Sequence, residues 1–180
     1  MGGDMKKVKL FAIDPGKSGG IAIYHNKVTI AAKMPDDITG FASVIDDHRK
    51  DCHPLVFLER VSMFMSDSDK GNNGKQFRIA KMLEQYNSMI TYFKIFMIPY
   101  VEITPMVWQK YLNLWVKRSS KTERKNKFKS AAMMWHPEIK VTNAISDALC
   151  ILHFARRKMG EDEAWVRQRI QLEPNEELPF

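Results

Sequence analysis

The sequence is poor in cysteine: its 180 residues include only Cys52 and Cys150, which lie far apart in the chain. Two distant thiols predict neither a disulfide framework nor a zinc site, and they are typical of a protein from a reducing cytosol. The sequence also lacks any apolar run close to the roughly 18 residues that a membrane-spanning helix needs. Its first ten residues lack the apolar centre of a secretory signal peptide. We therefore expect a cytoplasmic protein without a membrane segment.

Acidic residues are nearly missing from residues 105–130, where Glu123 faces eight lysines and arginines. The positive excess of this segment equals the net charge of the whole chain, +7, so the remaining residues are neutral on balance. Aromatic side chains are interleaved with the basic ones, as on many surfaces that bind polyanions. A solvated lysine-rich helix face would have the same composition, so both interpretations stay open. The basic residues are Lys110, Lys117, Arg118, Lys121, Arg124, Lys125, Lys127 and Lys129.

The hydrophobic pattern indicates one globular α/β domain. Hydrophobic residues make up 44% of the chain and charged residues 27%, and the length suffices for a real core. An initial meander of three strands is followed by alternating helices and strands, which is typical of a mixed sheet. Residues 1–160 are predicted to form the domain and residues 161–180 an acidic tail. We expect strands at 7–13, 20–25, 28–33, 54–61 and 94–104, and helices at 38–50, 75–94, 122–135 and 143–159, with a further helix starting at Pro105.

The stretch KLFAIDPGKSGGIAIY places a carboxylate where a strand ends. The apolar run that finishes at Ile13 is followed by Asp14 and by a turn rich in glycine. Asp-Pro-Gly begins tight turns, so turn formation is the simplest role for Asp14. A carboxylate on the rigid end of a strand also suits a metal ligand, but that interpretation needs partner carboxylates elsewhere.

Two further carboxylates interrupt apolar segments. Glu59 ends the fourth strand, where a buried charge costs several kcal/mol unless it is paired or solvated. Asp147 lies within AISDALCIL, an apolar helix in which aspartate is unusual. Asn143 precedes Asp147 by four residues, so it either caps this helix or shares a face with Asp147. Each residue has a structural alternative, but three such carboxylates together form a hard-oxygen set that suits Mg²⁺ or Mn²⁺.

The order of these residues resembles the ribonuclease-H-like nuclease superfamily and, within it, the RuvC-type Holliday junction resolvases. AIDPGKSGGIAIY is similar to the first strand motif of that family, VFLERVSMF to its second motif, and NAISDALCILHFA to its closing helix. KQFRIAKMLEQY, TPMVWQKYL and KTERK resemble the helices in between. The resemblance covers about residues 7–156. It implies a mixed five-stranded sheet flanked by helices.

The resemblance also implies metal-dependent hydrolysis of DNA at four-way junctions, with Mg²⁺ as cofactor and Mn²⁺ as a substitute. Asp14, Glu59 and Asp147 would be catalytic metal ligands, and Asn143 an auxiliary ligand. Two lysines of the basic segment would hold the scissile phosphate or stabilise its charge in the transition state: Lys110, and Lys121 or, because the register is loose, Lys125. The residues expected to contact DNA are Phe64, Lys110, Lys117, Arg118, Lys121, Arg124 and Lys125.

The resemblance implies a homodimer as well, because a four-way junction has two symmetric cleavage positions. The helix expected at 75–94 carries a broad apolar stripe that includes Phe77 and Phe93. This stripe suits part of a dimer interface, and it suits core packing equally well.

Asn143 departs from the family, which usually has an acid or a histidine one turn before the closing aspartate. An amide brings no negative charge, so a second metal ion should bind more weakly. His136 and His153 are candidate substitutes, although structural roles suit them better. Two alternatives stay open: a ribonuclease of the YqgF type with the same fold, and a non-catalytic junction-binding protein with a weakened metal site.

Overall fold

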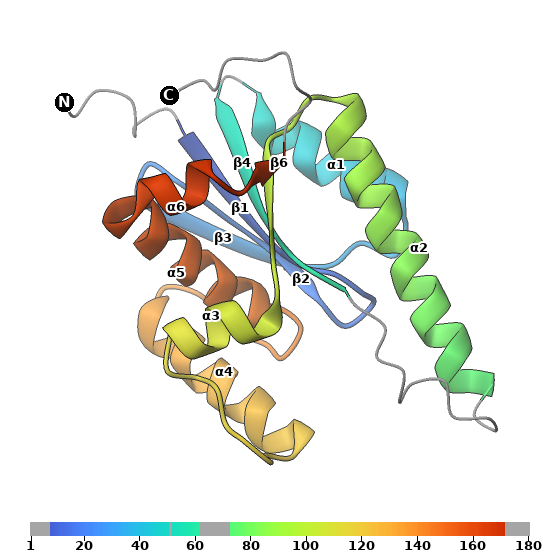
Figure 1. Cartoon of the computed structure of the whole chain (residues 1–180), viewed down its shortest axis with the longest axis vertical. Coiled ribbons are helices and arrows are strands. Elements are labelled where there is room, and N and C mark those ends of the chain that lie inside the picture. The colour runs from blue at the N-terminus through green and yellow to red at the C-terminus, as the bar shows by residue number, and fades with distance from the viewer. Residues whose placement is uncertain (1–7, 51, 62–72, 172–180) are drawn as a thin grey trace.

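Six strands form one mixed sheet in the order β3-β2-β1-β4-β5-β6 (Figure 1). The structure, a computed structural model, describes residues 8–50, 52–61 and 73–171. The first three strands form an antiparallel meander, β4 and β5 run parallel to β1, and β6 is antiparallel to β5. The predicted α/β class with a mixed sheet is therefore confirmed. The strands are β1 (Val8–Asp14), β2 (Gly20–His25), β3 (Val28–Lys33), β4 (His53–Glu59), β5 (Tyr100–Ile103) and β6 (Ile170–Gln171).

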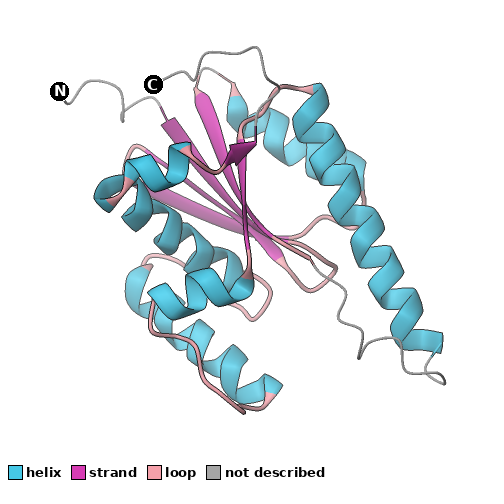
Figure 2. Ribbon diagram, in the orientation of Figure 1, coloured by secondary structure: helices cyan, strands magenta, loops and turns pink. Residues whose placement is uncertain are grey.

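Helices cover both faces of the sheet (Figures 1 and 2). α1 and α2 pack on one face and α3 to α6 on the other, which gives two apolar cores separated by the sheet. Alternation along β1 divides its side chains between them: Phe11 belongs to the core under α1 and α2, and Leu10 to the core under α5. The helices are α1 (Ile38–Arg49), α2 (Asn73–Ile95), α3 (Pro105–Tyr111), α4 (Lys121–Trp135), α5 (Ser146–Glu161) and α6 (Glu163–Arg167).

The apolar stripe of α2 is buried only in its second half. Phe93 is fully buried against the sheet, whereas Phe77 is 70% exposed. The first turns of α2 extend beyond the sheet (Figure 1), and none of the described residues buries Phe77. Core packing, one of the two roles left open for this stripe, therefore applies to its second half, while Phe77 stays exposed in the single chain.

The strand β6 was missed by the sequence prediction, which gave five strands. Its two residues are too few to show a periodicity, and they belong to the range expected as a tail. In that range, Val166 on α6 is 1% exposed, and Ile170 pairs with Val101 of β5. The first part of the expected tail is thus packed against the domain. Among the described residues, no helix is both long enough and apolar enough to cross a membrane.

Candidate active site

The turn after β1 places Asp14 at the edge of the sheet. Gly16 has a φ of +105°, a conformation that favours glycine, and its carbonyl accepts a hydrogen bond from the Gly19 amide at 2.9 Å. Gly20 lies opposite Asp14 in the ladder of β1 and β2. A Cβ at Gly20 would lie 2.7 Å from the carbonyl oxygen of Ala144, just before α5. The glycine-rich stretch therefore forms a turn and also lets the start of α5 approach the end of β1.

Glu59 reaches the same edge because β1 and β4 are parallel and in register. Ile13 pairs with Leu58, so the next residue of each strand, Asp14 or Glu59, lies beside the other. A hydrogen bond links the two side chains. On α3, the indole N–H of the fully buried Trp108 donates a long hydrogen bond to Glu59 Oε1, at 3.4 Å. Glu59 is thus held between β1 and α3.

Asp147 comes from the first turn of α5, and only 8% of it is exposed. Its Oδ2 accepts a hydrogen bond from the Nζ of Lys125 on α4, at 2.8 Å, which makes an ion pair. Its Oδ1 accepts a hydrogen bond from the Ser146 hydroxyl at 2.9 Å. Both carboxylate oxygens of Asp147 therefore have partners within the chain.

The pKa values of Asp14 and Glu59 are shifted by burial and by the charges around them. Burial raises the pKa of Asp14, and the charge of Asp147 raises it further, while the Lys125 ammonium opposes both; the net result is a pKa of about 7. Burial also raises the pKa of Glu59 well above its usual range, and the charges of Asp14 and Asp147 raise it further. The hydrogen bond between Asp14 and Glu59 lowers the pKa of the first and raises that of the second.

Lys125 belongs to the same electrostatic unit. Burial alone would lower the pKa of Lys125, but the charges of Asp147, Asp14 and Glu59 raise it. We name these four residues the carboxylate–lysine cluster. Three carboxylates gathered around one ammonium leave the cluster with an excess of negative charge whenever the acids are ionised.

The oxygen donors of the cluster suit a divalent metal ion in part. Its donors are hard oxygens, which Mg²⁺ and Mn²⁺ prefer. Desolvation raises the pKa values of Asp14 and Glu59, and a cation beside them would favour their ionised forms. In the part of the chain that the structure describes, no three His, Cys, Asp or Glu side chains are arranged to hold a metal ion. Asp14 and Glu59 therefore fit a divalent ion, while Asp147 is already engaged with Lys125 and Ser146.

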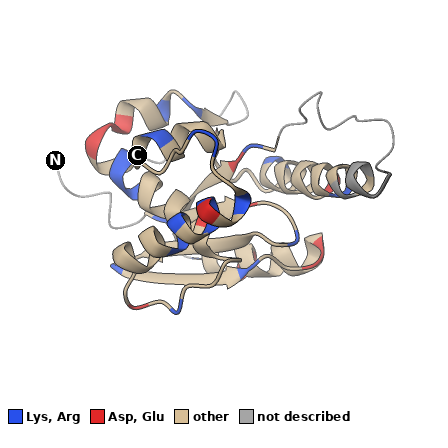
Figure 3. Ribbon diagram, turned by 90° about the horizontal axis from the view of Figure 1, so that it is seen from below, with Lys and Arg blue, Asp and Glu red and all other residues tan. Residues whose placement is uncertain are grey.

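The remaining basic residues predicted to act on DNA are exposed on α3, on α4 and in the loop between them. Of the two lysines left open for the scissile phosphate, Lys125 reaches the carboxylates, and Lys121 is exposed at the start of α4. Figure 3 marks the lysine and arginine positions along the ribbon. The exposed members on α3, on α4 and in the loop between them are Lys110, Lys117, Arg118, Lys121 and Arg124.

Asn143 does not cap the closing helix, which corrects one of the two roles expected from the sequence. α5 begins at Ser146, because the amides of Ile145 and Ser146 both bond to the carbonyl of Thr142 and form a turn first. The Asn143 side chain is exposed in that turn. Phe64 lies outside the described residues.

The two histidines considered as substitute ligands belong to another part of the fold. His136 ends α4 and is fully buried, and His153 stacks on Trp135 with ring centroids 4.1 Å apart. These contacts are those of packed side chains.

Sequence reasoning missed the contribution of Trp108 and Ser146 to the cluster. Both gave a weak signal. A buried tryptophan needs a partner for its indole N–H, and Trp108 follows Pro105 on the apolar side of a short helix. A serine directly before Asp147 is able to donate a hydrogen bond to it. The sequence alone does not identify Glu59 as the partner of Trp108, because the two residues meet only when the fold places α3 beside β4.

No protein-family model and no curated protein matches the chain. Solved structures do match it. RuvC of T. thermophilus, in complex with a Holliday junction substrate, is 14% identical with a TM-score of 0.50, and the match covers 86% of this chain and 96% of that chain. The chain has a RuvC-like fold.

The RuvC-like fold confirms the architecture expected from the sequence, with six strands in place of five. A second structure of Thermus thermophilus RuvC is 16% identical with a TM-score of 0.48, and that match covers 84% of this chain and 96% of that chain. At 14% identity the likeness establishes the fold. The reaction has to be argued from the residues of the cluster.

Proposed function

We propose that this protein is a metal-dependent endonuclease that hydrolyses phosphodiester bonds in four-way DNA junctions. The observation that carries the proposal is the meeting of Asp14, Glu59 and Asp147 at one edge of the sheet, within electrostatic reach of one another. Gathering three acids at one place raises the energy of the free protein, since like charges repel and desolvation penalises the ionised forms of Asp14 and Glu59. A bound cation would offset this repulsion, and it would also attract the phosphate of a substrate.

Asp14 and Glu59 are the residues proposed to hold the divalent ion. Asp147 and Asn143 were the further ligands expected from the sequence, but Asp147 is engaged with Lys125 and Ser146, and Asn143 is exposed in the turn before α5. When bound, the ion would activate a water molecule and neutralise charge on the phosphate. The water oxygen forms a bond to phosphorus while the bond from phosphorus to the 3′ oxygen breaks. The products are a 5′-phosphate and a 3′-hydroxyl that has taken up a proton.

The substrate class rests on charge and on the neighbour with the same fold. The exposed basic residues of α3, α4 and their loop, among them Lys117 and Lys121, suit the phosphates of DNA. The RuvC neighbour is described as bound to a Holliday junction substrate. A symmetric junction favours a homodimer, and the exposed Phe77 on α2 is a candidate for the interface between two copies. Phe64 is proposed to insert into the junction.

Cleavage assays test this proposal directly. The full chain is incubated with a labelled four-way junction, a linear duplex, a flap and a structured RNA, each with Mg²⁺, with Mn²⁺ and with a chelator. We expect junction cleavage that needs the metal and is lost in Asp14→Asn and Glu59→Gln. Preferential cleavage of RNA would favour the YqgF-type ribonuclease instead.

A second candidate function is a junction-binding protein without nuclease activity. It is favoured by the absence, among the described residues, of three acidic or histidine side chains arranged to hold a metal ion. In that case the protein would bind the junction with equal affinity in the presence and absence of metal, and no condition would produce cleavage.

A further inference from the structure

Lys125 and Asp147 form a short, partly buried ion pair within the carboxylate–lysine cluster. Nζ and Oδ2 are 2.8 Å apart, and the two side chains are only 27% and 12% exposed. The Ser146 hydroxyl occupies the other oxygen of Asp147. A partly buried ammonium with a good hydrogen bond interacts with a carboxylate far more strongly than an exposed lysine does.

Charge balance limits how many metal ions such a cluster can accept. One divalent ion and the Lys125 ammonium together neutralise the charges of Asp14, Glu59 and Asp147. A second divalent ion would leave an excess of two positive charges and would have to compete with Lys125 for Asp147. Asn143, the position where the related nucleases carry an acid or a histidine, contributes no negative charge to offset this.

We propose that the Lys125 ammonium acts as a built-in second cation, so that the site takes a single divalent ion at Asp14 and Glu59. The proposal rests on the proposed function in one respect, since it requires a divalent ion at this site. Asp147 is then a positioning residue, which holds the ammonium next to the other two carboxylates. Lys125 supplies positive charge close to the phosphate, and because Asp147 already holds the ammonium in place, no further ion has to be bound and ordered.

The competing explanation is that the pair only fastens α4 to α5. These helices also share apolar packing, with Phe128 and Ala132 of α4 buried in the same core as Leu149 of α5. A purely structural pair would change the stability of the protein when removed, but it would leave the number of bound metal ions unaltered. Metal stoichiometry therefore separates the two explanations.

The experiment is a calorimetric titration of the full chain with Mn²⁺ and with Mg²⁺, supported by thermal unfolding. We expect one ion per chain for the unmodified protein and for Lys125→Arg. Lys125→Met should bind two, because it frees Asp147, and the double variant Lys125→Met/Asp147→Asn should return to one. Lys121→Met removes the same charge from an exposed position on the same helix and should also bind one.

An electron paramagnetic resonance spectrum of the Mn²⁺-loaded protein tests the same point without any substitution. One isolated ion gives a six-line spectrum, whereas two neighbouring ions give a spin-coupled one. Two ions in the unmodified protein, or one ion in a folded Lys125→Met variant, would overturn the inference and leave the proposed nuclease function intact. Absence of metal binding from every variant, together with absence of cleavage, would overturn both.

Discussion

Gly20 on β2 faces Asp14 on β1, and it is the residue against which the segment leading into α5 packs. A Cβ on residue 20 would lie 2.7 Å from the Ala144 carbonyl oxygen, 3.0 Å from the Ala32 carbonyl oxygen and 3.1 Å from the Ile145 Cα. All three are backbone atoms, which cannot move aside as the end of a side chain can. Gly20 therefore sets how closely α5, and with it Asp147, approaches Asp14.

Gly20→Ala should displace the start of α5 and destabilise the protein by about 1 to 3 kcal/mol, the usual cost of forcing an extra carbon into a packed site. Chemical denaturation measures the change, and metal titration should show weaker binding. Gly160→Ala is the matched control. Apart from its chain neighbours and the nearby backbone of its own helix, nothing lies within 4 Å of a Cβ built there. Gly160 is in α5, so alanine should stabilise the helix by about 0.5 to 1 kcal/mol. Equal effects of the two changes would contradict this role of Gly20.

Trp108→Phe should weaken metal binding several-fold, by acting on Glu59. The indole N–H donates to the Glu59 carboxylate and holds the pKa of that carboxyl lower than burial alone would. Without this donor the pKa of Glu59 rises further, so a cation has to displace a more tightly held proton. We also expect a loss of stability of about 1 to 2 kcal/mol from the hydrogen bond and the smaller ring.

Calorimetric metal titration at pH 7 and at pH 8.5 checks the effect of Trp108→Phe. The loss of metal affinity in Trp108→Phe should be smaller at pH 8.5, since fewer protons compete with the metal ion for Glu59 there. Trp165→Phe alters a partly buried tryptophan that packs on Phe154 and should leave metal affinity unchanged. A deficit that does not depend on pH would mean that Trp108 acts through packing alone.

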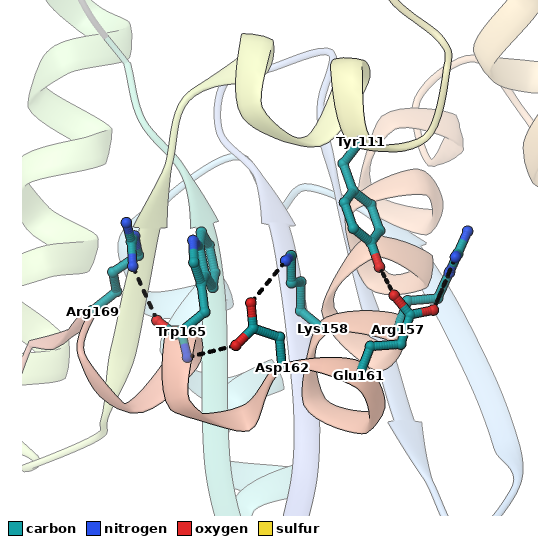
Figure 4. Close-up of polar contacts among 7 residues, drawn as sticks. All are labelled: Tyr111, Arg157, Lys158, Glu161, Asp162, Trp165 and Arg169. Carbon is teal, nitrogen blue, oxygen red and sulfur yellow. Dashed lines mark hydrogen bonds and ion pairs between the residues drawn. The ribbon is translucent and has the colours of Figure 1, made fainter.

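The packing of the C-terminal segment predicts that Trp165 contributes to the stability of the domain. Trp165 packs edge-on against Phe154, at 5.8 Å between ring centroids, and lies between the side chains of Lys158 and Arg169 (Figure 4). Its amide also bonds to Asp162, and Tyr111 donates a hydrogen bond to the neighbouring Glu161. Trp165→Ala should cost about 2 kcal/mol, less than a fully buried tryptophan, as measured by urea denaturation.

Glu163→Ala provides the comparison for Trp165→Ala. It removes an exposed ion pair with Arg167 from the same helix, and such pairs contribute roughly 0.5 kcal/mol. If both variants unfold at the same urea concentration as the unmodified protein, α6 lies on the domain without stabilising it. The folded domain would then end close to residue 160, as expected from the sequence.

His153 should make the stability of the protein sensitive to acid. Burial, together with the positive charges of His136, Arg156 and Arg157, lowers the pKa of His153 to about 4. The neutral form is thus favoured by folding, so its contribution is complete above pH 6.5 and is lost as the pH falls from 6.5 towards 4. After allowance for partial solvent screening, the loss is about 1 to 2 kcal/mol.

Asp14 and Glu59 respond in the opposite direction, because their raised pKa values make the folded state more stable as they take up protons. A single variant isolates the histidine. His153→Phe keeps a ring against Trp135 and cannot be protonated, so it should lose less stability than the unmodified protein between pH 7 and pH 4.5. His53→Gln, at an exposed position, serves as the control. Identical acid sensitivity in all three proteins would exclude this role for His153.

The strand ends that carry Asp14 and Glu59 could be predicted from the sequence, because an apolar run that stops at a carboxylate is a local pattern. Asp147 could be predicted for a similar reason, as an acid within an apolar helix. The sequence could not predict which of Lys121 and Lys125 reaches the carboxylates. This depends on how α4 packs on α5, and Lys125 and Asp147 are 22 residues apart in the chain. The start of α5 was missed because asparagine favours a helix cap in general, whereas the carbonyl of Thr142 accepts the first bonds here.

The last prediction concerns DNA binding by the exposed basic residues. The triple variant Lys117→Ala, Lys121→Ala and Arg124→Ala removes three charges from α4 and the loop before it, outside the carboxylate–lysine cluster. Each lost phosphate contact lowers the slope of log affinity against log salt by about 0.9 on duplex DNA, so the slope should fall by about 2 to 3. Because phosphate contacts do not read sequence, junctions of different sequence should be affected equally.

Fluorescence anisotropy with a labelled junction, measured at several salt concentrations without metal, gives this slope. The control variant removes three exposed lysines, Lys27, Lys50 and Lys94. They come before the starts of β3, β4 and β5, respectively. Because β4 and β5 run parallel to β1, Lys50 and Lys94 lie at the end of the sheet opposite Asp14, and Lys27 is in the hairpin at that same far end. The control has the same net charge as the test variant, so a general charge effect would lower both slopes alike. A lower slope in the test variant alone assigns the phosphate contacts to α4 and its loop, and equal slopes would leave this segment as a solvated helix face.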